Sequence, residues 1–156
     1  MLEFDHLFIC KPDSQGQRYI QTVPDLVTVG FTRKCQTQNW IEKLFKKETI
    51  TFHETGDEPL VFSLRKPWWF SNWYEVVEAE DYRIGLFDDK KIINGSVEWG
   101  YLAIDRKTIA LKTKCQRLLA TFQPDGMGEK IIFSPEVSSE PYLKMLLLGF
   151  VLVYSS

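Results

Sequence analysis

The sequence of 156 residues has little of the material from which catalytic and metal sites are built. It contains two histidines and three cysteines, Cys10, Cys35 and Cys115, at wide and unrelated spacings. Scattered cysteines in odd number do not form a disulfide framework, so we expect reduced thiols in a cytoplasmic protein. Nucleophile elbows, G-x-x-x-x-G-K loops, H-E-x-x-H motifs and paired C-x-x-C motifs are missing. We therefore predict no catalytic residues, no metal and no cofactor.

A charge excess of one sign is also missing. Nineteen Lys and Arg oppose 21 Asp and Glu, a net charge of −2, which argues against a nucleic-acid partner. Hydrophobic residues make up 44% of the chain and charged residues 26%, which is typical of a soluble core. The length predicts a single domain over residues 1–156. Aromatic residues are abundant at 14%, and this bulk indicates a β-rich interior.

One apolar run is long enough to raise the question of a membrane. Residues 142–154 are apolar except for Lys144 near the start, but a spanning helix needs roughly 20 such residues. We expect a buried helix; a strand and a weak tail anchor remain as alternatives. Ser138 or Ser139 is expected to cap it, with Glu140 and Pro141 in the first turn. A helix that is apolar on every side has to be surrounded by protein.

The rest of the chain alternates between apolar and polar residues, which predicts short strands. Asn94-Gly95 is the clearest hairpin signal. One amphipathic helix is predicted over residues 40–47. Strands followed by an apolar helix suggest a barrel wrapped around that helix. The predicted strands lie near residues 60–64, 74–76, 82–86, 97–103, 109–116, 118–122 and 131–133, after a strand-like stretch over residues 1–36.

The stretch Leu60-Val-Phe-Ser-Leu-Arg-Lys-Pro-Trp-Trp-Phe70 and the following Trp73 to Phe87 carry a resemblance to a known family. They form a strand, a basic-proline-aromatic corner, Tyr-x-Val-x-acid, a turn, and hydrophobic-Gly-x-aromatic. This unit resembles the tubby C-terminal-like superfamily, which includes phospholipid scramblases and plant LURP-one-related proteins. The apolar run at the end of the chain is similar to the terminal helix of that group, so the resemblance covers residues 59–156.

The resemblance implies a mainly β fold: a closed antiparallel β-barrel of about a dozen strands that encloses the hydrophobic C-terminal helix. Scramblase activity is not carried over, because the chain has no proline-rich extension, no cysteine cluster and no acidic calcium loop. Tubby-type phosphoinositide binding stays open, because its basic residues cannot be matched to positions in this sequence.

Two groups of residues are candidates for binding a lipid or a partner. Lys112 and Lys114 share one face of a predicted strand, about 7 Å apart, and such a patch suits an anionic headgroup or an acidic partner. The alternative is the solvated face of an edge strand. The full patch consists of Lys112, Lys114, Arg106, Lys107 and Arg117.

The second group combines cations with indole rings, as a membrane interface does. Its alternative role is to pack over the end of the barrel. Its members are Arg65, Lys66, Trp68, Trp69 and Trp73.

These features predict a non-enzymatic binding domain that docks peripherally on anionic phospholipid or on a protein partner. The alternative function is a carrier of a small hydrophobic ligand, or an enzyme, with its pocket inside an open β-barrel. The two differ in whether the C-terminal helix fills the barrel. The oligomeric state is left open.

Overall fold

The computed structural model describes residues 1–35, 48–68, 71–94, 97–105, 108–113 and 115–154. These residues form twelve strands and a C-terminal helix. The strands are β1 (His6–Cys10), β2 (Arg18–Thr22), β3 (Thr28–Cys35), β4 (Glu48–Glu54), β5 (Leu60–Lys66), β6 (Tyr74–Glu78), β7 (Arg83–Phe87), β8 (Lys91–Asn94), β9 (Val97–Asp105), β10 (Thr108–Lys112), β11 (Leu118–Asp125) and β12 (Gly128–Phe133), and the helix is α2 (Pro141–Tyr154).

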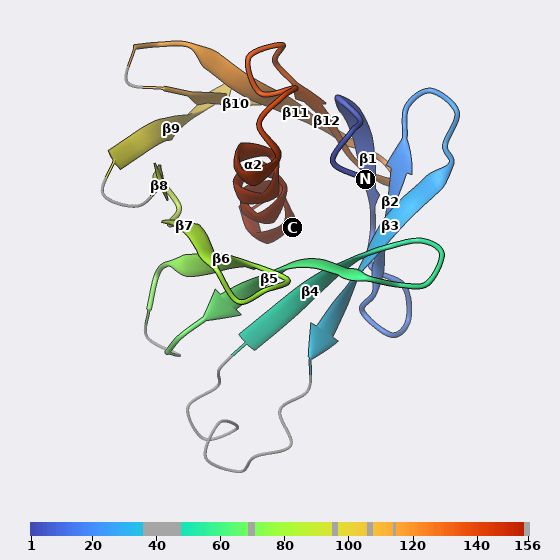
Figure 1. The fold of residues 1–156 in the computed structure, drawn as a ribbon. Helices are drawn as coiled ribbons and strands as arrows, with labels where there is room; N and C mark the ends of the chain where they lie inside the picture. The colour runs from blue at the N-terminus through green and yellow to red at the C-terminus, as the bar shows by residue number, and fades with distance from the viewer. Residues whose placement is uncertain (36–47, 69–70, 95–96, 106–107, 114, 155–156) are drawn as a thin grey trace.

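The strands form one closed barrel in which each strand pairs antiparallel with its neighbours in the sequence. The barrel closes between β1 and β12, where His6 lies opposite Ile132 and Cys10 opposite Gly128. Figure 1 shows α2 inside the ring of strands. This arrangement confirms the predicted fold class, a mainly β closed antiparallel barrel that encloses a hydrophobic C-terminal helix.

Two of the predicted local features have different outcomes. Asn94 at the end of β8 pairs with Val97 at the start of β9, so the hairpin expected at Asn94-Gly95 is confirmed. The strand predicted over residues 109–116 is wrong beyond Lys112. There a bulge interrupts the ladder, and Thr113 closes a turn by donating to the carbonyl of Arg117 at 2.8 Å. The helix predicted over residues 40–47 lies outside the described residues.

The helix α2 supplies the centre of the core. Every residue from Leu143 to Leu152 is buried, so the strand and tail-anchor alternatives for this run are wrong. Gly149 is needed for the close fit, because a Cβ there would lie 2.6 Å from Leu64 Cδ2 and 3.2 Å from Phe87 Cε1. No helix within the described ranges has the length and hydropathy needed to cross a bilayer.

The start of α2 differs from the prediction. The amide of Lys144 donates to the carbonyl of Glu140 at 3.0 Å, which makes Glu140 the residue that precedes the helix, and Pro141 the first helical residue. Glu140 is thus outside the first turn. Neither predicted serine begins the helix, and the hydroxyl of Ser138 donates instead to the carbonyl of Ser134 at 3.4 Å.

A fully buried lysine fixes α2 against the chain's N-terminal segment. Lys144 Nζ donates to the carbonyls of Leu2 (2.8 Å) and Phe4 (3.2 Å) and to Asp5 Oδ1 (2.8 Å). The ammonium also lies 5.4 Å from the centre of the Phe133 ring. All three N–H donors of the ammonium therefore have partners, as a buried charge requires.

Candidate functional site

The two ends of the barrel differ because α2 runs through it in one direction. Tyr142 at the start of α2 lies against Tyr82, which precedes β7. Tyr154 at the end of α2 lies against Phe87, the last residue of β7. We call the end of the barrel near Tyr142 the N-terminal mouth and the end near Tyr154 the C-terminal mouth.

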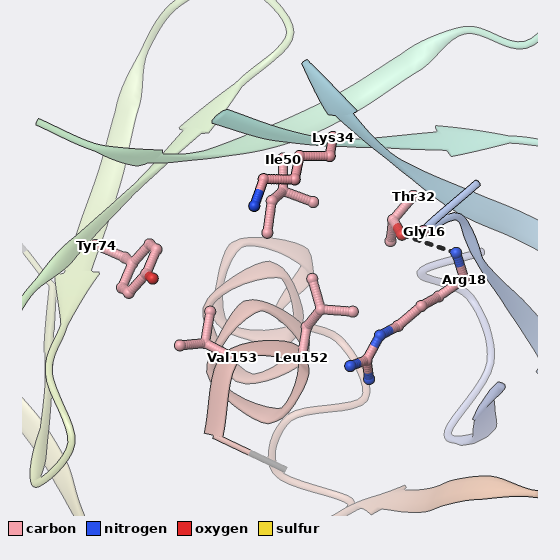
Figure 2. Close-up of a pocket in the computed structure, with 8 residues that line it drawn as sticks. All are labelled: Gly16, Arg18, Thr32, Lys34, Ile50, Tyr74, Leu152 and Val153. Carbon is pink, nitrogen blue, oxygen red and sulfur yellow. Dashed lines mark hydrogen bonds between the residues drawn. The ribbon is translucent and has the colours of Figure 1, made fainter. Parts of the chain in front are cut away.

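A cavity of about 200 Å³ opens at the C-terminal mouth. Its floor is apolar and consists of Leu152 and Val153 from α2 together with Ile50 from β4. Figure 2 shows Arg18 from β2 and Lys34 from β3 extending toward this floor from the surrounding strands. The amide of Arg18 donates to Thr32 Oγ1 at 3.2 Å, which fixes the start of β2 beside β3. The remaining lining residues are Gly16, Thr32 and Tyr74.

A second cavity, of about 350 Å³, adjoins the first and shares Tyr74 and Val153 with it. The other residues that line it come from the end of β5, the loop that follows β5, the loop after β7 and the end of α2; they are Lys66, Ser71, Asn72, Asp89 and Tyr154. The hydroxyl of Tyr154 donates to the carbonyl of Asn72 at 3.4 Å. The two cavities together form a basic hollow with an apolar floor.

The cations of this hollow are held by neighbours of different kinds. Lys34 Nζ lies 2.6 Å from Glu48 Oε1, and 59% of the lysine side chain is exposed. An ion pair this exposed exchanges easily with other anions, because its net strength is small. Lys66 Nζ lies 5.6 Å from the centre of the Tyr74 ring, within the range of a cation–π interaction.

Both tyrosines of the hollow resist ionisation. Burial raises the pKa of Tyr74, and the negative charge of Glu48 adds to the effect. Burial also raises the pKa of Tyr154 to about 12, with further contributions from Asp89, Tyr74 and Asp88. The two phenols therefore remain neutral hydrogen-bonding groups near neutral pH.

The described members of the aromatic-basic group predicted from the sequence lie in different surroundings. Lys66 lines the larger cavity, and Trp68, in the loop after β5, is 43% exposed. Trp73 is half-buried, which agrees with the alternative of packing over the barrel end. Arg65 instead pairs with Asp81 at 2.6 Å, outside the hollow. Trp69 lies outside the described residues.

The structure describes part of the basic patch predicted around β10. Lys112 ends β10 at the N-terminal mouth, and Arg117 follows in the turn that leads to β11, where it lies 3.9 Å from Glu136. Arg106, Lys107 and Lys114 lie outside the described residues. The strand on which Lys112 and Lys114 were expected to share a face ends at Lys112, and their common face stays a prediction.

Sequence reasoning missed Arg18 and Lys34. The two residues are far from Lys66 in the sequence, and only closure of the barrel brings them to one mouth. A usable signal existed: Arg18 begins its strand, and Lys34 and Lys66 are at the ends of theirs. In an antiparallel meander, the starts of even-numbered strands and the ends of odd-numbered strands lie at the same mouth.

The connecting segments make the N-terminal mouth the more acidic of the two. Among the described residues, the connections at the N-terminal mouth contain one Lys or Arg and seven Asp or Glu, whereas those at the C-terminal mouth contain two and three. The dipole of α2 complements this charge, since the positive end of the helix lies at the acidic N-terminal mouth. Within the described parts of the chain, no group of three or more His, Cys, Asp or Glu residues is arranged to hold a metal ion.

Comparisons with known proteins support the fold alone. No family model matches the sequence, and no curated protein matches it. The X-ray structure of a protein from Arabidopsis thaliana (AT5G01750) is similar, with a TM-score of 0.64 and 9% sequence identity. The match covers 95% of this chain and 90% of the plant protein. This chain therefore shares the fold of that plant protein.

Proposed function

We propose that this chain is a tubby C-terminal-like domain of the scramblase-like and LURP-one-related kind, and that it is a non-enzymatic binding domain. Its ligand is the surface of an anionic membrane, on which it docks peripherally through the C-terminal mouth. The observation that carries this proposal is the basic hollow. Lys34 and Lys66 lie around an apolar floor, and the exposed Trp68 follows two residues after Lys66.

The arrangement suits a phospholipid interface. Ammonium groups meet lipid phosphates, while an indole ring settles at the level of the headgroups. The excess of acidic residues in the described connections at the N-terminal mouth, seven against one, orients the barrel with the C-terminal mouth toward the membrane. The acidic N-terminal mouth then faces away from the negative leaflet.

Expected affinities are modest. Each lysine near an anionic leaflet contributes about 1 kcal/mol, so Lys34 and Lys66 together account for about 2 kcal/mol, or roughly thirtyfold in affinity. Insertion of Trp68 adds a component that salt does not screen. We therefore expect reversible attachment that weakens, but does not vanish, as the ionic strength rises.

The alternative of a carrier or enzyme with a pocket in an open barrel has less support. α2 occupies the barrel interior, and its residues Leu146, Leu147 and Leu148 are fully buried. The two cavities described above lie at the C-terminal mouth, against the end of α2.

Co-sedimentation with vesicles tests the proposal. Vesicles of phosphatidylcholine, with and without phosphatidylserine, are mixed with the wild type and with a Lys34→Glu/Lys66→Glu variant. A Lys112→Glu/Arg117→Glu variant, which makes the same change of charge at the N-terminal mouth, is the matched control. We expect the first variant to lose at least about thirtyfold in affinity and the control to bind like the wild type.

Other outcomes contradict the proposal in distinct ways. Equal losses in both variants would mean that net charge, not the hollow, governs binding. Loss only in the control would assign the membrane contact to the N-terminal mouth. If the wild type does not bind phosphatidylserine vesicles at all, a protein partner becomes the better hypothesis.

A further inference from the structure

Three successive turns at the N-terminal mouth expose apolar side chains. The turn between β2 and β3 presents Leu26 and Val27, β5 begins with the exposed Leu60 after the next turn, and Tyr82 (62% exposed) ends the third. Tyr142 at the start of α2 (46% exposed) continues the strip. Exposed apolar residues gathered on neighbouring turns form a candidate interaction surface.

Carboxylates accompany the apolar residues in each turn. Asp25, Asp57 and Glu80 are exposed and form no ion pair with any residue that the structure describes. Two neighbouring carboxylates are already neutralised: Glu58 by Arg33 at 2.9 Å and Asp81 by Arg65 at 2.6 Å. The strip thus keeps a net negative charge. We call it the acidic rim, consisting of Asp25, Leu26, Val27, Asp57, Leu60, Glu78, Glu80, Tyr82 and Tyr142.

The tyrosine pair gives the acidic rim a place for a cation. The rings of Tyr82 and Tyr142 lie 6.4 Å apart at an angle of 43°. Interaction of the Tyr142 hydroxyl with the Glu78 carboxylate, together with the negative charge of Glu80, raises the pKa of Tyr142. Exposed aromatic rings beside carboxylates attract ammonium and guanidinium groups through both the ring faces and the negative charge.

We propose that the acidic rim binds a polypeptide segment in which apolar side chains alternate with Lys or Arg. Charge complementarity selects this occupant, because the rim repels an anionic membrane surface and its apolar residues need a partner that covers them. The strands of a barrel lie about 4.8 Å apart, so the turns from β3 to β7 extend over roughly 20 Å. An extended segment of about six residues has this length.

Peptide binding at the acidic rim is independent of membrane docking by the basic hollow, because the two surfaces lie at opposite mouths. A domain attached to a membrane through the C-terminal mouth leaves the acidic rim accessible to a basic partner. Failure of vesicle binding therefore does not affect the rim, and failure of peptide binding does not affect the hollow.

The test is fluorescence anisotropy with a labelled synthetic peptide of alternating Lys and Leu, added to the intact chain. Two further peptides separate the contributions: one replaces each Leu with Ser, and the other replaces each Lys with Glu. The protein variants are Asp57→Lys/Glu80→Lys and Tyr82→Ser. The matched control is Asp125→Lys/Met127→Ser, which changes one exposed acid and one exposed apolar residue at the C-terminal mouth.

We expect the Lys/Leu peptide to bind and both substituted peptides to bind at least about tenfold more weakly. Each rim variant should lose about tenfold in affinity, while the control keeps the wild-type affinity and all variants keep the wild-type thermal transition. Equal binding of the Lys/Ser peptide, or an equal loss in the control, would overturn the proposal. Self-association of the chain by sedimentation velocity, abolished by Glu80→Lys, would overturn it in favour of a second copy as the occupant.

Discussion

Replacing Lys144 with methionine tests whether the buried ammonium holds α2 in place inside the barrel. Methionine keeps most of the volume, so packing changes little, but the carbonyls of Leu2 and Phe4 and the Asp5 carboxylate lose their donor. An orphaned buried acceptor costs about 1–3 kcal/mol. Because Asp5 is 45% exposed and can regain water, we count only the two carbonyls. We expect Lys144→Met to lower the free energy of unfolding by at least about 2 kcal/mol.

The same contact makes a pH-dependent contribution to stability. The hydrogen bond from Lys144 lowers the pKa of Asp5 below its ordinary value of 3.8. The unfolded chain therefore binds a proton at higher pH than the folded one. The stabilisation is present above about pH 4 and is lost as the pH falls through the lower folded pKa. In Lys144→Met this loss on acidification should be absent.

Urea denaturation followed by tryptophan fluorescence, at neutral pH and in acid, measures both effects. With a slope of about 2 kcal/mol per molar urea, the midpoint of Lys144→Met should fall by about 1 M. Asp5→Asn is the control, since it removes the charge but leaves both carbonyl contacts, and its midpoint should fall less. If the urea midpoint of Lys144→Met equals or exceeds that of the wild type, the buried lysine does not stabilise the fold and the reasoning is wrong.

Two further predictions concern the barrel interior and its C-terminal mouth. Leu147 is fully buried in α2, so Leu147→Asp should cost several kcal/mol and unfold the domain; a cooperative thermal transition near that of the wild type would contradict the central role of α2. The pKa of Tyr154 is raised to about 12, whereas a tyrosine of the unfolded chain has a pKa of about 10. The unfolded chain therefore releases this proton at lower pH. The stabilisation that Tyr154 provides is lost as the pH rises from about 10 to about 12. Tyr154→Phe should reduce the loss of stability in alkali, as measured by urea midpoints across that range, and an unchanged loss would show that another group dominates.

The sequence predicted the elements whose causes are local. Asn94-Gly95 predicted its hairpin because both residue types favour tight turns, and Asn94 ends β8 opposite Val97. The apolar run after Pro141 is too short to span a bilayer and too apolar for a surface helix. Both expectations needed only neighbouring residues. The family resemblance then supplied the closure of the barrel, which periodicity alone does not indicate.

Features that depend on distant parts of the chain were not predicted. The buried role of Lys144 was not predicted, because its three acceptors lie at residues 2–5. The basic hollow requires Arg18, Lys34 and Lys66 to meet through barrel closure. The end of the predicted strand at Lys112 has a local cause that alternation did not reveal, since a turn closed by Thr113 and Arg117 follows it.

The position of α2 after all the strands in the sequence has a consequence for how the protein folds. The twelve strands leave the ribosome before α2, and until then their inward faces, with Phe52, Phe62 and Leu64, have nothing to pack against. Final consolidation joins Lys144 to Leu2, residues separated by 142 positions in the sequence. Contacts of such range slow folding, because the chain loses the entropy of a long loop before they form. A growing chain of this protein therefore exposes apolar strand faces until α2 has been synthesised, and it needs shielding from other chains during that time.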